Sequence, residues 1–137
     1  MRRARKRHLS PERGYALLVT LVVILLLFFA LSLLAAALQI RMRLVRQEAQ
    51  TLKLIALSDA ALAETLASLT YDPGFSGVTE QSFGGGRISS TVRSLGPNRY
   101  EVLATAFYAG KLRAVDAEAV RTPQGARVVR WERALGW

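Results

Sequence analysis

The feature that most constrains this chain is an uninterrupted apolar run near its N-terminus. From Tyr15 to Leu38 the sequence reads YALLVTLVVILLLFFALSLLAAAL, which is 24 residues without a charged side chain. A helix of that length extends about 36 Å, which exceeds the roughly 30 Å hydrocarbon core of a bilayer. Thr20 and Ser32 can return their hydroxyl hydrogen bonds to the helix's own carbonyl groups. The sequence therefore predicts a transmembrane helix over residues 15–38.

A basic leader, residues 1–14, precedes the apolar run. Residues 1–13 carry six basic side chains against one acidic side chain, a net charge of +5. These six outnumber the three arginines that follow the run, Arg41, Arg43 and Arg46. Because Lys and Arg favour the cytoplasmic end of a span, we expect a cytoplasmic N-terminus and a C-terminal domain on the other side of the membrane. This local explanation of the charge argues against nucleic acid as a partner.

The alternative for the apolar run is a secretory signal peptide. Hydrophobic cores of signal peptides span only about 7 to 15 residues and end in a small-residue cleavage site. Ala35-Ala36-Ala37 has the composition of such a site, and cleavage there would release a soluble secreted domain. The length of the run favours the transmembrane helix.

The helix is expected to continue beyond the membrane as an amphipathic segment over residues 39–70. Residues 39–69 contain neither Gly nor Pro, and Tyr71-Asp72-Pro73-Gly74 supplies turn and helix-breaking residues at its end. One predicted stripe comprises Leu52, Ile55, Asp59, Leu62, Ala63, Leu66 and Leu69. Its large members, which we expect to pack against a sheet, are Leu52, Ile55, Leu62, Leu66 and Leu69.

The remaining sequence predicts a Gly- and Ser-rich connection over residues 71–86 and an antiparallel β-meander over residues 87–137. Four segments alternate at period two between turn residues, with expected strands at 87–95, 99–108 and 111–121 and a last one after residue 125. The inward-facing residues are expected to be Ile88, Val92, Tyr100, Val102, Ala104, Ala106, Val115, Ala117, Ala119, Val129 and Trp131. The predicted fold class is α+β: a long helix whose amphipathic half packs on a small four-stranded antiparallel sheet.

No catalytic set is visible in the sequence, so we expect no enzyme, cofactor, metal site or small-molecule substrate. The chain has no cysteine, and its one histidine, His8, lies in the basic leader. Asp116 and Glu118 share a strand face, but the proximity of Arg113 and Arg127 favours a solvated charged surface over a carboxylate dyad. Of the two tryptophans, Trp131 has strand spacing typical of a core residue. Trp137 is the better candidate for a partner contact.

The order of these features resembles the type IV pilin-like family, most closely the PilX-like minor pilins and minor pseudopilins. The resemblance depends on the basic leader ending in Arg13-Gly14, the aromatic Tyr15, the apolar helix with its amphipathic continuation, and the small sheet. It implies that a prepilin peptidase cleaves after Gly14 and methylates the new amino terminus at Tyr15. It also implies location in a bacterial inner membrane, and inclusion in a pilus or pseudopilus beside other major and minor subunits.

In that family the apolar helix packs with neighbouring helices, a role that the resemblance gives to Leu17, Leu18, Val19, Val22, Leu25 and Leu26. One departure concerns the fifth mature position, where major pilins carry a glutamate and this chain has Val19. Some minor subunits placed at a filament tip lack that glutamate, so Val19 indicates a minor or initiating role. The competing hypothesis is an uncleaved single-pass anchor or adaptor that carries a small extracytoplasmic interaction domain.

Overall fold

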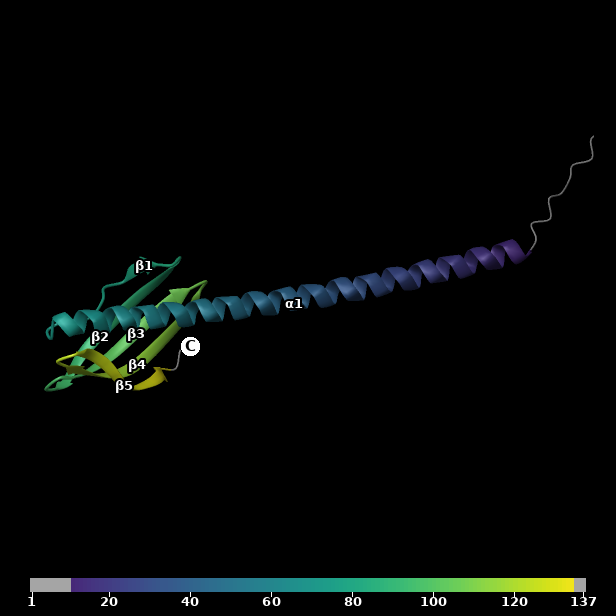
Figure 1. Cartoon of the computed structure of the whole chain (residues 1–137). Helices are drawn as coiled ribbons and strands as arrows, with labels where there is room; N and C mark the ends of the chain where they lie inside the picture. Colours follow the sequence, from purple (N-terminus) through teal and green to yellow (C-terminus); the bar gives the residue numbers. More distant parts are fainter. Residues whose placement is uncertain (1–10, 135–137) are drawn as a thin grey trace, which may run out of the picture. The chain divides into compact units, whose positions relative to one another are not determined.

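The computed structural model describes residues 11–134, which form one long helix followed by an antiparallel sheet (Figure 1). The elements are α1 (Pro11–Tyr71), β1 (Gln81–Phe83), β2 (Gly86–Gly96), β3 (Arg99–Tyr108), β4 (Lys111–Thr122) and β5 (Gly125–Ala134). The chain divides into two compact units, the first ending at Val45 and the second beginning at Arg46. The fold class is α+β, and α1 contributes residues to both units.

Local hydrogen bonds end α1 at the expected turn sequence. The amide of Asp72 donates to the carbonyl of Ser68 at 2.9 Å, which closes the last turn of the helix. The Asp72 carboxylate then accepts a hydrogen bond from the amide of Gly74 at 2.9 Å, and Pro73 has no amide with which to continue the ladder. The chain therefore reverses after Tyr71 and enters the sheet.

The sheet has five strands in the order β1-β2-β3-β4-β5, and every neighbouring pair is antiparallel. The prediction of four strands was wrong because the segment expected to be a linker contains β1. Gly84 and Gly85, with φ of 55° and 82°, form the two-residue turn that joins β1 to β2. A turn with positive φ at both central residues matches the twist of a hairpin, so these glycines connect two paired strands.

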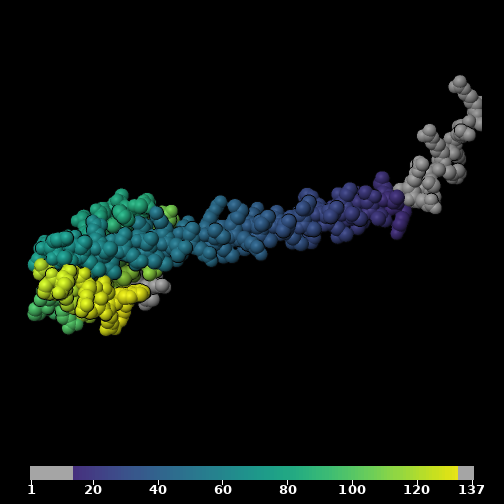
Figure 2. Space-filling model, viewed as in Figure 1, coloured from purple at the N-terminus to yellow at the C-terminus, as the bar shows by residue number. Residues whose placement is uncertain are grey.

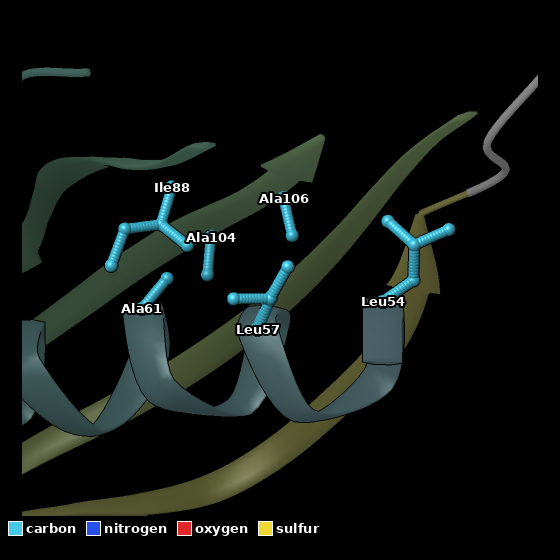
Figure 3. Close-up of a cluster of buried hydrophobic side chains, with 6 residues drawn as sticks. All are labelled: Leu54, Leu57, Ala61, Ile88, Ala104 and Ala106. Atoms are coloured by element: carbon cyan, nitrogen blue, oxygen red, sulfur yellow. The ribbon is translucent and has the colours of Figure 1, made fainter. Parts of the chain in front are cut away.

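The second unit buries one face of the sheet under the C-terminal part of α1. Figure 3 shows the first of two apolar clusters, in which side chains from the helix point toward the strands. It consists of Leu54, Leu57, Ala61, Ile88, Ala104 and Ala106. The second cluster consists of Leu69, Tyr100, Val102 and Ala119. Leu62 packs against both clusters and so joins them into one core.

Most of the predicted inward face of the sheet is confirmed. The buried residues are Ile88, Tyr100, Val102, Ala104, Ala106, Val115, Ala117 and Ala119. Val92 is half-buried. The prediction was wrong for Val129 and Trp131, which are 54% and 61% exposed on β5. Both lie on an edge strand, where the alternation of apolar residues does not guarantee that a second layer covers them.

The structure also corrects the buried face of the helix. Leu52 is 67% exposed, so its predicted packing against the sheet was wrong, whereas Leu69 is fully buried. Ile55, Leu62 and Leu66 are half-buried. The centre of the buried face is formed by smaller side chains, Ser58, Ala61 and Thr65. A stripe chosen by its leucines missed this centre because small residues give a weak hydrophobic signal.

A series of hydrogen bonds crosses the interface between helix and sheet. The Thr65 hydroxyl donates to the carbonyl of Ala61 at 2.7 Å, and the hydroxyl oxygens of Thr65 and Ser90 lie 2.6 Å apart. The amide of Val78 donates to the Ser90 hydroxyl at 2.9 Å. Since each hydroxyl has one proton, Ser90 donates to Thr65, and every donor in the series has an acceptor. These buried hydroxyls are therefore satisfied without water.

Two further hydrogen bonds attach the end of α1 to β4 and β5. The Arg121 guanidinium donates to the carbonyl of Thr70 at 3.3 Å, which satisfies a terminal helix carbonyl. The Thr70 hydroxyl accepts a hydrogen bond from the amide of Ala126 at 3.0 Å. The helix end is thus fixed to the sheet by polar as well as apolar contacts.

The corrected helix face gives a matched pair of substitutions. Leu69→Ala should lower the free energy of unfolding of the second unit by about 2 to 4 kcal/mol, because it leaves a cavity in a fully buried site. Leu52→Ala should change it by less than about 0.5 kcal/mol, because that side chain is already exposed. Urea denaturation of the detergent-solubilised chain measures both, and equal losses would contradict the assigned face.

Removal of the Ser90 hydroxyl tests the buried hydrogen bonds. Ser90→Ala leaves the Val78 amide without its acceptor, and we expect a loss of about 1 to 3 kcal/mol in the free energy of unfolding. Ser94→Ala is the control, since it makes the same change at an exposed position of β2. A Ser90 variant as stable as the Ser94 variant would show that the buried hydrogen bonds contribute nothing to the fold.

Candidate functional site

The candidate functional site is the apolar part of α1 in the first unit, together with the Gly14–Tyr15 bond. The six side chains assigned to helix packing, Leu17, Leu18, Val19, Val22, Leu25 and Leu26, are between 43% and 74% exposed. Large apolar side chains all along this segment are exposed in the same way. Exposure to water of so much apolar surface is unfavourable, so lipid or other apolar helices must cover it.

Among residues 11–134, one helix is long and apolar enough to cross a bilayer. Its most apolar window has a mean hydropathy of 3.2, and none of that window is buried. The hydroxyls of Thr20 and Ser32 donate to the carbonyls of Ala16 and Phe28 at 2.8 and 2.9 Å, as the sequence predicted. The polar side chains of the apolar segment are therefore satisfied within the helix, which is consistent with a single-pass membrane protein.

The Gly14–Tyr15 bond lies in the first turns of α1, which begins at Pro11. A methyl group placed on Gly14 would have no atom within 4 Å, and Tyr15 is 72% exposed. Among the described residues, then, neither side of this bond is packed against other side chains, although glycine is an unfavourable residue within a helix.

The apolar segment offers no carboxylate to a positively charged neighbour. Between Gly14 and Ile40 the sequence contains no acidic residue, and the fifth residue after Gly14 is Val19. A desolvated ammonium group beside this helix would find no compensating charge on it.

The outer face of the sheet, opposite α1, is charged and has no catalytic arrangement among the described residues. Glu118 forms an ion pair with Arg99, and its strand neighbours across the sheet are Glu101 and Arg130. The predicted solvated face is therefore present, although its basic partners differ from those expected. Arg113 instead faces the helix, where its Nε donates to the Ser58 hydroxyl at 3.1 Å.

The part of the chain that the structure describes contains no group of three or more His, Asp or Glu side chains placed to hold a metal ion. His8 and Trp137, which the sequence analysis considered, lie outside the described residues. Trp131 was expected in the core, and its exposure on β5 is the main feature that sequence reasoning missed. Its position on the last described strand was the available signal, because a terminal strand of a meander lies at an edge.

Comparison with known proteins gives no match: no family model, no curated protein and no solved structure is similar to the chain. Function is therefore inferred from the residues and the geometry described above. The two features from which we infer it are the exposed Gly14–Tyr15 segment and the uncovered apolar surface that follows it.

Charged substitutions in the apolar segment test its insertion. The run from Tyr15 to Leu38 contains ten Leu, three Val, two Phe and one Ile. At about −0.3 to −0.6 kcal/mol each, these contribute roughly −5 to −10 kcal/mol to insertion. Two arginines cost about 5 to 7 kcal/mol, which offsets most of this gain, so Val22→Arg/Leu26→Arg should strongly reduce membrane retention during alkaline extraction.

The control for this experiment is Val45→Arg/Leu52→Arg, which adds the same charges outside the run. This variant should remain in the membrane fraction like the unmodified chain. Equal retention of both double variants would mean that residues 15–38 do not span the membrane.

Proposed function

We propose that this chain is a minor pilin-like structural subunit of a type IV pilus or type II secretion system. It acts in filament assembly or initiation through helix–helix packing. The observation that carries the proposal is the uncovered, uncharged surface of α1, which begins directly after Gly14. The basic leader before it and the compact sheet unit after it complete the order of elements that supports this reading.

The apolar surface suits both environments that a filament subunit occupies. In the membrane, lipid covers Leu17, Leu18 and the residues that follow. When the subunit leaves the bilayer, the same surface must stay out of water, because each fully buried Leu is worth about 1.5 to 3 kcal/mol. A bundle of neighbouring apolar helices provides that cover. In this proposal the six-residue set from Leu17 to Leu26 forms the helix–helix contact.

Val19 favours an initiating or tip position over a place in the filament shaft. A shaft subunit that follows the major pilin pattern would supply a carboxylate to the amino terminus of its neighbour, and this segment has none. A subunit with no neighbour to neutralise has no use for that carboxylate, and a buried unpaired charge would be costly. The proposed partners are the membrane, a prepilin peptidase and other major or minor subunits.

The second candidate function is an uncleaved single-pass anchor or adaptor. The same Val19 favours it, because an anchor that only contacts lipid has no reason to carry a charge in its span. The second unit has its own core and is fixed to the end of α1 by Thr70 and Arg121, so it could present a binding surface without other subunits. Under this hypothesis the Gly14–Tyr15 bond stays intact.

Intact-mass and N-terminal peptide mass spectrometry on protein from native membranes distinguishes the pilin-like subunit from the uncleaved anchor. The pilin-like function predicts a chain that begins at N-methylated Tyr15. Gly14→Val should block processing and retain residues 1–14, because the branched side chain replaces the glycine after which cleavage occurs. Gly74→Val, in an exposed turn of the second unit, is the control and should be processed normally.

Detection of Met1 to Gly14 on the unmodified chain, in membranes that contain an active prepilin peptidase, would exclude the pilin-like function. That result would favour the anchor. A new amino terminus directly after Ala37 would instead indicate a released secreted domain.

A further inference from the structure

One edge of the sheet in the second unit is long and unpaired. Among residues 11–134, β5 has a single hydrogen-bonded neighbour, β4, so the opposite side of this strand has no partner there. The strand runs from Gly125 to Ala134, ten residues, and contains no proline. At about 3.3 Å per residue it offers an edge of roughly 30 Å, which accommodates a typical strand of five or six residues.

Two apolar side chains on this edge are exposed, together with two arginines and Glu132. Val129 and Trp131 are 54% and 61% exposed, and Arg127 and Arg130 beside them are also exposed. Figure 2 shows the C-terminal strand in yellow at the surface of the second unit. An exposed tryptophan on an edge strand is unusual, because the free backbone N–H and C=O groups of such a strand can pair with other chains.

The register explains why these side chains are exposed. Glu118 lies opposite Arg130 and Ala119 lies opposite Val128, so Val129 is an extra residue with no partner on β4. A bulge of this kind bends the strand and changes the direction of its side chains. Trp131 pairs with Ala117 and so lies on the face of the sheet that carries the core, but its side chain is 61% exposed.

The other edge of the sheet is different. β1 has only three residues, and its Gln81 donates to the Glu64 carboxylate. Shortness is one of the ways in which proteins protect a strand edge. The long edge at β5 therefore stands out as the place where a further strand can be added.

We propose that the free edge of β5 is the docking site for an extended acidic strand of a partner protein. Main-chain hydrogen bonds between β5 and the added strand would provide affinity, and contacts of every second side chain would provide specificity for the partner sequence. β5 carries three arginines, Arg127, Arg130 and Arg133, against Glu132, so its net charge is +2, and within the strand Arg130 forms an ion pair with Glu132. A partner strand with acidic residues along one face complements this charge, and an apolar residue on its other face can cover Trp131.

A second copy of this chain fits the edge less well. Pairing of β5 with β5 would bring together two strands that each carry a net charge of +2. Like charges opposite one another across a strand pair are destabilising, whereas an acidic strand meets the same arginines with opposite charge. The proposal goes beyond the proposed function, because the edge is available in either a filament subunit or an anchor.

Fluorescence of Trp131 in the full-length chain in detergent provides the test. Trp137→Phe leaves Trp131 as the one tryptophan of the chain. The probes are a peptide of about eight residues with alternating glutamate and valine, its lysine and valine counterpart, and the acidic peptide N-methylated at alternate amides. We expect the acidic peptide to shift the Trp131 emission to shorter wavelength, and the methylated peptide to bind at least about tenfold more weakly.

Charge reversal on the edge should exchange the preference of the site. Arg127→Glu/Arg130→Glu should weaken binding of the acidic peptide by about tenfold and favour the basic one. Arg93→Glu/Lys111→Glu makes the same change of net charge away from β5 and should leave binding unchanged. Circular dichroism of each variant establishes that the fold is intact.

Three results of the peptide experiment would overturn the proposal. They are no emission shift with the acidic peptide, equal binding of the methylated peptide, and equal loss in the control variant. Self-association that is abolished by Arg127→Glu/Arg130→Glu would also overturn it, because the edge would then serve a second copy. None of these results bears on whether Gly14 is cleaved.

Discussion

The packing of the C-terminal part of α1 on the sheet is the contact on which the second unit depends. Its centre is made of small side chains, Ser58, Ala61 and Thr65 from the helix, and a row of alanines from β3 and β4 faces it. Large buried side chains lie toward the ends of the contact, Leu54 and Leu57 at one end and Leu69 at the other. Because an isolated sheet of this size has one face to bury, the helix supplies the layer that makes the meander stable.

The two parts of α1 differ in which of their faces are polar. In the second unit the helix is amphipathic, and polar residues such as Thr65 and Ser58 form specific hydrogen bonds with β2 and β4. Between Tyr15 and Leu38, in the first unit, the helix carries no charged side chain on any side, and Thr20 and Ser32 donate hydrogen bonds to carbonyls of the helix itself. The second unit therefore completes its own core, whereas the first requires a membrane or other helices.

The proposed function depends on the first unit, and the proposed docking edge lies in the second unit. In the two proposals, assembly or anchoring is assigned to the uncovered apolar surface after Gly14, and recognition is assigned to β5 with Val129 and Trp131. A strand edge can be exposed without loss of stability when the sheet is already covered by α1 on its buried face. The charged outer face, with Glu118 paired to Arg99, keeps the remaining surface hydrated.

The sequence by itself determined the features that arise from local periodicity and from long uniform segments. These include the apolar run from Tyr15, the end of the helix before Pro73, the boundaries of β2 to β4 within one or two residues, and the alternation that buries Val102 and Ala117. Each depends on neighbouring residues along the chain, so a single sequence contains enough information.

Only the tertiary structure decided which residues face each other across the layers. The rotation of α1 that buries Ala61 and exposes Leu52 follows from how closely small side chains fit the sheet, which hydrophobicity alone does not encode. The hairpin at Gly84 became evident only once β1 was paired. Likewise, Trp131 has the spacing of a core residue, but its burial depends on whether another layer covers β5, which the spacing along one strand does not specify, and in the structure the side chain is in contact with solvent.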